Sequence, residues 1–443
     1  MRTPLCIISA FLIASCIVSF PTQSTCAAER PKDAKAWLAE ARKSADALKN
    51  LGAKVDALSG IAEVEAGMGD VKASDKTLAQ ASALALKIDD SYDRSQAFHA
   101  ILKVQAKRKM LSEASATLKK IEDTEDKVYA LCELGIAYSK AGKNGQAAKI
   151  FSEALKNSRV VECELAQGEM RSAIAEAQAE CGMFSDAVAT ADDTKTLCAI
   201  AIKYQKAGLR AEAQKLMATA EAGIKMSKDE MAPLQTEEGA DNLSDVVDTL
   251  CAVAEAQKAI GNKDRAAAHL ATAKSLILGM KEFKSADWYR SWTLKSFVAS
   301  LVACGNLDEA EALMNRMHDP EMKAFAMAAV ASGYAKAGDR ERALNILLEA
   351  AAVAKKAEDP WDVASEIFQA EVELSMYTRA LEIADKIGFL NDKAFGCLGL
   401  ALAKAGKTDR LEEAFKHIKG PGGKISYCLG AARGLAAAKA KNG

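Results

Sequence analysis

The sequence predicts an all-α protein, an α/α superhelical solenoid built from helical hairpins. Three observations support this fold class. Alanine, which has the highest helix propensity, accounts for 90 of the 443 residues. Half of the chain is hydrophobic although only 5% is aromatic, and only 7 prolines occur. A short phrase also recurs along the chain. This composition excludes a β-sandwich, a disordered chain and a disulfide scaffold.

The recurring phrase is Tyr-x-Lys-Ala-Gly, which becomes Leu-Ala-Lys-Ala-Gly in its last copy. It stands at 138–142, 204–208, 334–338 and 402–406. About ten helix-forming residues precede each copy, and Ala or Leu follows five positions after each glycine. We expect the glycine to end a first helix in the left-handed conformation. The small residue then lets a second helix approach the first closely, with apolar residues at helical spacing along the seam.

Ten units of this kind follow one another along the chain. They start near Val55, Ser95, Val128, Gly168, Thr194, Val247, Ser291, Ala324, Trp361 and Asp392. The close-contact position holds Ser74, Ala114, Ala147, Ala187, Ala213, Ala266, Ala310, Ala343 and Ala380. The clearest starts are separated by multiples of roughly 66 residues, which indicates a two-hairpin superunit. Long second helices are expected to alternate with short ones, so the superhelix should be irregular.

The unit near Val128 resembles the tetratricopeptide repeat, a 34-residue helical hairpin. It carries Leu134, Gly135, Tyr138, Gly142, Ala147, Phe151 and Ala154 at the offsets of that repeat. The other units match less fully, but the resemblance extends over nearly all of the chain after the leader. It implies an α/α solenoid whose concave face binds proteins or peptides.

The expected organisation has four parts. Residues 1–27 form a signal peptide, and 28–224 contain the first half of the hairpins. Residues 225–245 are polar and acidic and are expected to form a loop. Residues 246–443 contain the second half and end in a capping helix, with one continuous solenoid favoured over two domains. The glycine-rich segment 420–423 is expected to be a turn before that last helix, whose outer face should be polar.

The N-terminus has the pattern of a secretory signal peptide. A short basic start is followed by an uncharged, mostly apolar stretch at 5–20 and then by small residues, so cleavage is expected near Ala27–Ala28. Export to the periplasm or the extracellular space follows from this pattern. Two alternatives stay open: lipidation of Cys16 within an Ile-Ala-Ser-Cys sequence, and an uncleaved leader. Only these two would attach the chain to a membrane.

Charge and motifs argue against several activities. Lys plus Arg total 59 and Asp plus Glu total 60, so no basic face that would bind nucleic acid is indicated. The four histidines form no metal-binding spacing, no phosphate loop occurs, and no catalytic or cofactor-binding residue is assigned. Of the eight cysteines beyond the leader, five recur in phase with the repeat: Cys132, Cys198 and Cys251 at one position, and Cys181 and Cys304 just before the turn. We therefore expect them to be small buried side chains and expect no disulfide ladder.

Two sets of residues are candidate partner-binding sites. The first is a lysine row at one repeat position: Lys140, Lys206, Lys336 and Lys404. The second is an aromatic patch centred on Trp288, Tyr289 and Trp292, in a chain with only 4 tryptophans. The ordinary alternatives are a solvated helix face for the first set and a locally larger core for the second.

These observations predict an exported, non-enzymatic scaffold that binds a protein or peptide through its concave face. One alternative is a lipid-anchored assembly factor of the cell envelope. Another is a helical-hairpin enzyme acting on polysaccharide, which would need two carboxylates facing Trp288 or Trp292 across a cleft. No cofactor is expected.

Overall fold

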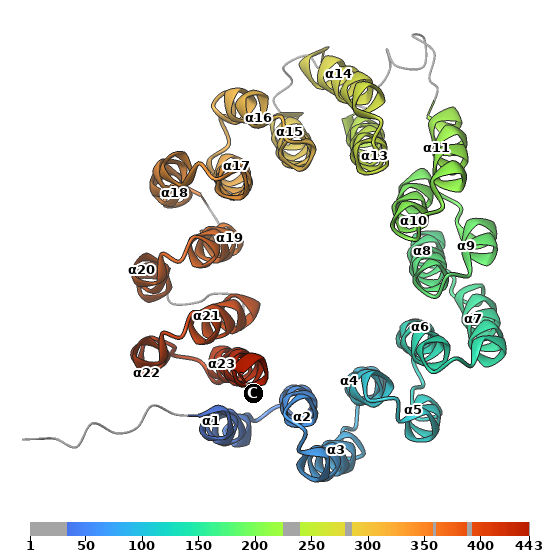
Figure 1. Cartoon of the computed structure of the whole chain (residues 1–443), viewed down its shortest axis with the longest axis vertical. Helices are drawn as coiled ribbons and strands as arrows, with labels where there is room; N and C mark the ends of the chain where they lie inside the picture. Colours follow the sequence, from blue (N-terminus) through green and yellow to red (C-terminus); the bar gives the residue numbers. More distant parts are fainter. Residues whose placement is uncertain (1–32, 225–239, 280–285, 358–359, 388–391, 443) are drawn as a thin grey trace, which may run out of the picture. The chain divides into compact units, whose positions relative to one another are not determined.

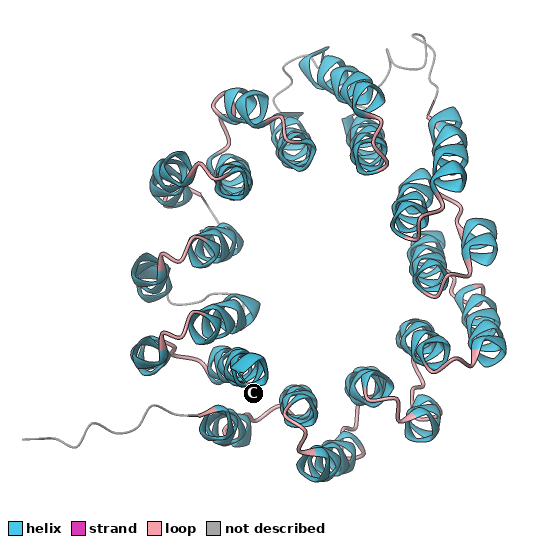
Figure 2. Cartoon of the chain, in the orientation of Figure 1, coloured by secondary structure: helices cyan, strands magenta, loops and turns pink. Residues whose placement is uncertain are grey.

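The computed structural model describes residues 33–224, 240–279, 286–357, 360–387 and 392–442. Within these ranges it contains 22 α-helices and no strand (Figure 2). The all-α solenoid prediction is therefore confirmed. Twenty of the helices form ten consecutive hairpins, and each of the ten predicted starts lies in or beside the first helix of one hairpin.

The hairpins are built from two series of helices. The first helices are α2 (Leu51–Gly67), α4 (Ser91–Lys107), α6 (Thr124–Lys140), α8 (Glu164–Glu180), α10 (Thr194–Lys206), α13 (Ala240–Ala259), α15 (Ala286–Cys304), α17 (Pro320–Ala337), α19 (Pro360–Glu373) and α21 (Asp392–Lys404). The second helices are α3 (Val71–Ala85), α5 (Leu111–Leu118), α7 (Asn144–Ser158), α9 (Phe184–Thr190), α11 (Arg210–Gly223), α14 (Lys263–Gly279), α16 (Leu307–Met314), α18 (Arg340–Ala354), α20 (Tyr377–Ile387) and α22 (Thr408–Lys416). Each first helix packs against the next first helix, so the two series form two layers (Figure 1).

The hairpin turns share one backbone geometry. Each of the ten turns holds a residue at positive φ, and eight of these residues are glycines, including all four that the recurring phrase predicts. At Gly142 (φ 76°) the Gly142 N–H donates to the Ser139 carbonyl (2.8 Å), and the Lys143 N–H donates to the Tyr138 carbonyl (2.9 Å). These two bonds satisfy carbonyls at the end of the first helix. Lys109 and Ser375 adopt the same conformation without being glycine.

The predicted close-contact residues are buried at the seam between the two helices of their hairpins. The nine small residues from Ser74 to Ala380 are all buried, as expected. A complementary contact comes from Gly135, where an added Cβ would lie 2.7 Å from the Phe151 ring. Small side chains on both helices therefore let the layers pack closely, which explains how an alanine-rich, aromatic-poor chain fills its core.

The lengths of the second helices alternate over part of the chain. Helices α3, α5, α7 and α9 have 15, 8, 15 and 7 residues, as the two-hairpin superunit predicts. The alternation fails at α11 and α14, which have 14 and 17 residues. These two long helices precede and follow residues 225–239, which lie outside the described ranges.

The two remaining helices, α1 (Ala34–Asp46) and α23 (Pro421–Asn442), pack against each other although they are the first and last of the described helices. Helix α23 also packs against α21 on one side and α2 on the other. The described part of 32–443 is thus one compact unit in which the array of hairpins closes on itself (Figure 1).

Helices α23 and α1 reproduce the packing of a hairpin without a connecting turn. In α7 the side chains facing α6 are Ala147, Phe151, Ala154 and Ser158. Helix α1 carries Ala34, Leu38, Ala41 and Ala45 at the same spacing, and the last three are buried. Helix α23 occupies the first-helix layer between α21 and α2, and α1 occupies the second-helix layer. We call this pair the composite hairpin.

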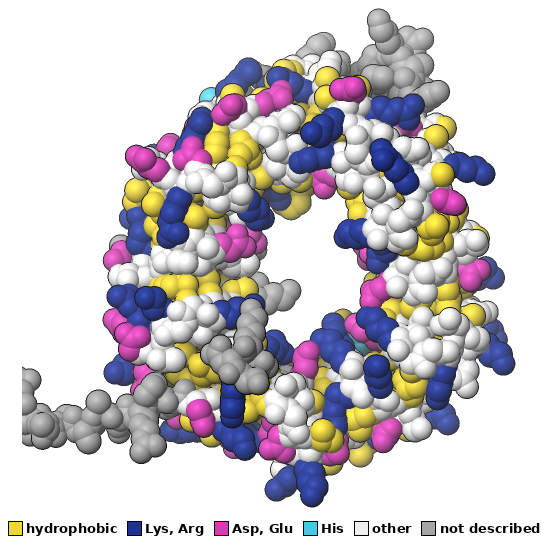
Figure 3. Space-filling view, in the orientation of Figure 1, with side chains coloured by type: hydrophobic (Ala, Val, Ile, Leu, Met, Phe, Trp, Pro, Cys, Tyr) yellow, Lys and Arg dark blue, Asp and Glu magenta, His cyan; other side chains and the backbone are white. Residues whose placement is uncertain are grey.

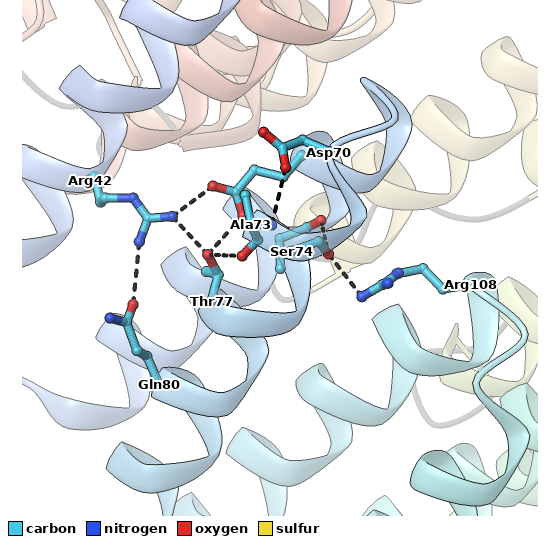
Figure 4. A network of polar contacts seen from close by, with 9 residues as sticks. Arg42, Asp70, Ala73, Ser74, Thr77, Gln80 and Arg108 are labelled. Carbon is cyan, nitrogen blue, oxygen red and sulfur yellow. Dashed lines mark hydrogen bonds and ion pairs between the residues drawn. The ribbon is translucent and has the colours of Figure 1, made fainter.

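Aromatic and polar contacts fix the composite hairpin in place. The fully buried Trp37 ring lies 5.7 Å from the Tyr427 ring and 5.4 Å from the Phe415 ring, both edge-on. Arg42 reaches from α1 to the next hairpin, where its Nη2 donates to Glu65 Oε1 (2.7 Å) and lies 2.7 Å from Thr77 Oγ1 (Figure 4). Since Thr77 Oγ1 donates to Glu65 Oε2 (2.7 Å), both oxygens of this buried carboxylate have partners.

A buried carboxylate at the same repeat position has fewer partners. Glu371 stands four residues before Ser375, as Glu65 stands four residues before Gly69. Only its Oε1 is bonded, by Arg379 Nε at 3.1 Å, and Oε2 has no partner. Burial raises the pKa of Glu371 to about 7 in spite of Arg379.

Three expectations for this part of the chain are wrong. A loop is expected over 225–245, but α13 already begins at Ala240. Leu243, in the first turn of α13, is buried in the core. Residues 421–423 begin α23 instead of forming a turn, since proline suits the first helical position. An added Cβ on Gly423 would lie 2.8 Å from the Phe395 ring. The last helix also lacks the expected polar outer face: 427–432 are all buried between its neighbours.

The predicted leader, its cleavage site and Cys16 lie outside the described residues. Among the helices that the structure does describe, none is both long and apolar enough to cross a membrane.

Candidate functional site

The predicted lysine row is exposed but discontinuous. All four lysines lie at the ends of first helices and are exposed, on α6, α10, α17 and α21. Of the four first helices between them, two carry acidic residues at the same position, Glu180 on α8 and Glu373 on α19, and two carry alanine, Ala259 on α13 and Ala303 on α15. Lys140 Nζ lies 2.7 Å from Glu180 Oε1. Basic and acidic side chains are accordingly interspersed across the visible surface (Figure 3), and the four lysines do not form one basic strip.

The predicted aromatic patch is described only in part. Trp288 and Tyr289 belong to α15, but their side chains lie outside the described set. Trp292 is 38% exposed, while Phe297 is buried in the core. Lys295 Nζ stands 3.5 Å above the centroid of the Trp292 ring and 5.4 Å from that of Phe325. One ammonium group therefore lies close to two aromatic rings on neighbouring first helices.

Lys295 and Phe325 also line a groove of about 440 Å³ that crosses three first helices. We call it the α15–α19 groove. Its lining is Lys295, Ser296 and Ala299 from α15, Phe325, Ala328, Ala329 and Ser332 from α17, and Glu366, Gln369, Ala370 and Glu373 from α19. The floor is mostly alanine, so a bound chain could approach the helix backbones closely. Trp292 stands at its rim through the contact with Lys295.

Burial and nearby carboxylates act in opposite directions on the one lysine that lines the α15–α19 groove. Burial lowers the pKa of Lys295, although Asp248, Glu321 and Glu366 act in the opposite direction. Burial likewise raises the pKa of Asp248. At the other end of the groove, the Ser332 hydroxyl donates to Glu373 Oε2 (2.8 Å). The arrangement is one lysine facing several carboxylates.

A second groove, of about 360 Å³, crosses α4, α6 and α8. We call it the α4–α8 groove. One of its carboxylates is paired with a lysine of the lining, because Lys103 Nζ lies 3.5 Å from Glu133 Oε1. His99 Nδ1 lies 3.6 Å from Asp126 Oδ1, and burial lowers the pKa of His99. The Lys140–Glu180 ion pair lies at its edge. This groove has the same construction as the α15–α19 groove, but two of its three carboxylates, Glu133 and Glu180, form ion pairs.

A third cavity, of about 500 Å³, lies where the α19–α20 and α21–α22 turns meet. Arg379, Lys407 and Arg410 line it together with Ser375 and Thr378. Two of the arginines are already engaged, Arg379 with Glu371 and Arg410 Nη1 with Thr378 Oγ1 at 3.0 Å.

The eight cysteines in the described part of the chain are free thiols; Cys428 is buried, and Cys181 and Cys304 are half-buried. Cys132, Cys198 and Cys251 are buried at one repeat position, and burial raises the pKa of each thiol to about 12. They act as small apolar side chains, as expected. Cys163 and Cys397 are exposed, so the expectation of burial is wrong for these two.

Sequence reasoning missed the acidic wall of the α15–α19 groove. In the sequence, Glu366 and Glu373 are indistinguishable from residues of a solvated helix face, because acidic residues alternate with basic ones along most of the chain. Their spacing of seven residues places both on one side of α19. That spacing was the available signal, but only the structure shows that this side faces Lys295 and Phe325.

The sequence pattern of the PPR repeat family matches residues 292–319, which cover most of α15 and all of α16. This span is one hairpin of the ten and does not assign the chain to that family. None of the curated proteins compared with the chain matches it.

Among solved structures, Ton1535 from Thermococcus onnurineus NA1 aligns at 15% identity and a TM-score of 0.26, over 85% of this chain and 99% of its own. Human IFIT1, solved as a dimer with m7Gppp-AAAA, aligns at 14% identity and a TM-score of 0.22, over 88% of this chain and 95% of its own. TM-scores of this size carry no argument about arrangement or function. The matched repeat and the ten hairpins together identify the chain as a helical-repeat protein.

Proposed function

We propose that this protein is an exported, non-enzymatic scaffold that binds an extended segment of a partner protein along its first-helix layer. The α15–α19 groove is the observation that carries the proposal. It is continuous across three repeats, it has a floor of small side chains, and an exposed tryptophan stands at its rim. Surfaces of this kind are what solenoids supply for binding.

The dimensions of the groove favour an extended segment. Packed helices lie about 8–10 Å apart, so three first helices span roughly 18 Å. An extended chain advances about 3.3 Å per residue, and five or six residues would cross the groove. Ser296, Ser332 and Gln369 place polar side chains along that path for hydrogen bonds to a peptide backbone.

The export part of the proposal is supported by the leader pattern at 1–27. Mass spectrometry of the mature N-terminus tests it. A product that begins near Ala28 is expected. A lipidated Cys16 would replace it with the envelope-anchored alternative, and an intact Met1 in an unexported chain would overturn it.

The enzyme alternative is less well supported. Two carboxylates, Glu366 and Glu373, do line the groove that has Trp292 at its rim. They stand on one helix, and seven residues correspond to about 10 Å along its axis. A glycosidase pair instead flanks the bond from two sides, at about 5–9.5 Å. RNA is the second candidate ligand, favoured by the PPR match at 292–319. The carboxylates of the groove oppose it, since they repel phosphates.

A peptide display experiment tests the proposed function. Residues 28–443 are screened against random dodecapeptides, and selected peptides are measured by fluorescence anisotropy. Ala299→Arg places a large side chain in the groove at an exposed position and should abolish binding. The matched control, Leu348→Arg, lies exposed on α18 in the other layer and should bind as the wild type does. Failure to select any peptide, or equal binding by Ala299→Arg, would contradict the proposal.

A further inference from the structure

The cation-binding surface of the α15–α19 groove is occupied by a side chain of the protein itself. Lys295 Nζ stands 3.5 Å above the Trp292 ring. An ammonium or guanidinium group over a tryptophan face is attracted by the ring quadrupole. Lysine has a flexible four-carbon stem with a mobile head group. Lys295 can therefore leave this face without any movement of the backbone.

The charges around Lys295 come from four helices. Asp248 on α13, Glu321 on α17 and Glu366 on α19 all act on Lys295. Glu373 lines the far end of the groove. Lys195 on α10 is a further cation that acts on Asp248. Lys295 thus interacts with three carboxylates and forms no ion pair with Glu366 or Glu373 in the groove lining, so a second positive charge would be attracted.

The α4–α8 groove provides the contrast within the same molecule. Its lysines are matched by carboxylates in contact, as in Lys103–Glu133 and Lys140–Glu180. The linings of the two grooves hold similar charge, with three carboxylates and two lysines here and two carboxylates and one lysine in the α15–α19 groove. The difference lies in pairing: Glu133 and Glu180 form ion pairs, whereas Glu366 and Glu373 form none with the described residues. Of the two grooves, only the α15–α19 groove combines such carboxylates with a tryptophan face.

We propose that the α15–α19 groove selects a basic segment, one containing Lys or Arg, of the partner protein, and that Lys295 is an internal competitor for the site that the incoming cation takes. This inference rests on the proposed function and names the class of its ligand. The partner's cation occupies the Trp292 face, and the groove carboxylates neutralise it. Lys295 turns outward when the segment binds.

Three dodecapeptides with the same apolar residues and with Lys, Gln or Glu at four positions test this inference. Their affinities are measured by fluorescence anisotropy with residues 28–443, at low and high salt. The Lys peptide should bind at least tenfold more tightly than the Gln peptide, and the Glu peptide should bind most weakly. The preference should shrink as salt rises.

Variants separate the roles of the groove residues. Lys295→Gln removes the competitor and should tighten binding of the Lys peptide by about three- to tenfold. The double variant Glu366→Gln with Glu373→Gln should weaken it by about tenfold. Lys355→Gln, which changes a lysine just after α18, is the matched control and should have no effect.

The outcomes distinguish the inference from the proposed function. Equal binding of the three peptides, tighter binding of the Glu peptide, or weaker binding by Lys295→Gln would overturn the basic-segment inference while leaving a peptide scaffold. Preferential binding of single-stranded RNA would overturn both. So would a failure of all three peptides and of the display library to bind the wild type.

Discussion

The hairpin α6–α7 and the composite hairpin α23–α1 perform the same packing with different connections. In the first, a left-handed glycine joins the two helices within a few residues. In the second, the helices come from opposite ends of the chain, and Trp37 fills the seam. The comparison teaches that packing alone is enough to define a repeat. The turn sets the local backbone geometry, whereas the apolar pattern determines which two helices pack together.

The largest expected loss of stability comes from truncating the buried aromatic side chains of the two hairpins. Trp37→Ala and Phe151→Ala should each lower the free energy of unfolding by about 3–5 kcal/mol, because both side chains are fully buried. Urea unfolding followed by circular dichroism measures the loss. Trp292→Ala, at a partly exposed position, serves as the control. If Trp37→Ala cost no more than the control, the composite hairpin would not be equivalent to α6–α7.

Substitutions of glycines at close helix contacts are expected to have the next largest effect on stability. An added Cβ on Gly430 would lie 2.0 Å from the Gly396 carbonyl oxygen, whereas on Gly135 it would meet the Phe151 ring at 2.7 Å. A backbone atom yields less than a side chain, so Gly430→Ala should cost about 3 kcal/mol and Gly135→Ala about 1–2 kcal/mol. Gly168→Ala is the control because nothing lies within 4 Å of its added Cβ. Thermal unfolding that ranked the two substitutions in the reverse order would show that α21–α23 can separate.

Substitutions in the turn, which only the α6–α7 hairpin has, are expected to change the free energy of unfolding by a smaller amount. Gly142→Ala forces an alanine into the left-handed region at φ 76° and should cost about 1 kcal/mol. Lys109→Gly should instead raise the free energy of unfolding, because a non-glycine residue already occupies the left-handed region there at φ 59°. Melting temperatures of both variants measure this. The composite hairpin has no position at which such an effect could appear.

The smallest effect is expected at the ion pair that joins the chain ends. Arg433 Nη2 on α23 lies 2.9 Å from Glu63 Oε2 on α2, and both side chains are partly exposed. Arg433→Ala should therefore change the free energy of unfolding by less than about 1 kcal/mol, and less still in high salt. An effect as large as that of Trp37→Ala would mean that charge, and not apolar packing, closes the array.

The elements that were predictable from the sequence are those with a local cause. The left-handed glycines and the small residues five positions later depend on neighbours within one hairpin, and the structure places them as expected. The turns at Lys109 and Ser375 lacked the glycine signal. The composite hairpin could not be predicted because α1 carries only half of a repeat, and its other half lies at the far end of the sequence. Sequence order gives no information about that contact.

The candidate site was predictable only in part for the same reason. Trp292 stood out by composition, since tryptophan is rare in this chain. Its significance depends on Lys295 one turn later and on Phe325 and Glu366 from other helices. The lysine row is interrupted, because Glu180 and Glu373 stand at the same position on two of the helices between its members. A repeat position specifies a residue on one helix, whereas the groove is lined by residues from three helices.

The composite hairpin also sets the order in which the molecule can be completed. Helix α1 is synthesised well before α23, so the surface around Trp37 has no partner until α23 has been made. The other ten hairpins can each form as soon as their own two helices exist. A chain truncated before Pro421 would therefore keep an uncovered apolar surface on α1, α2 and α21, the helices that α23 contacts.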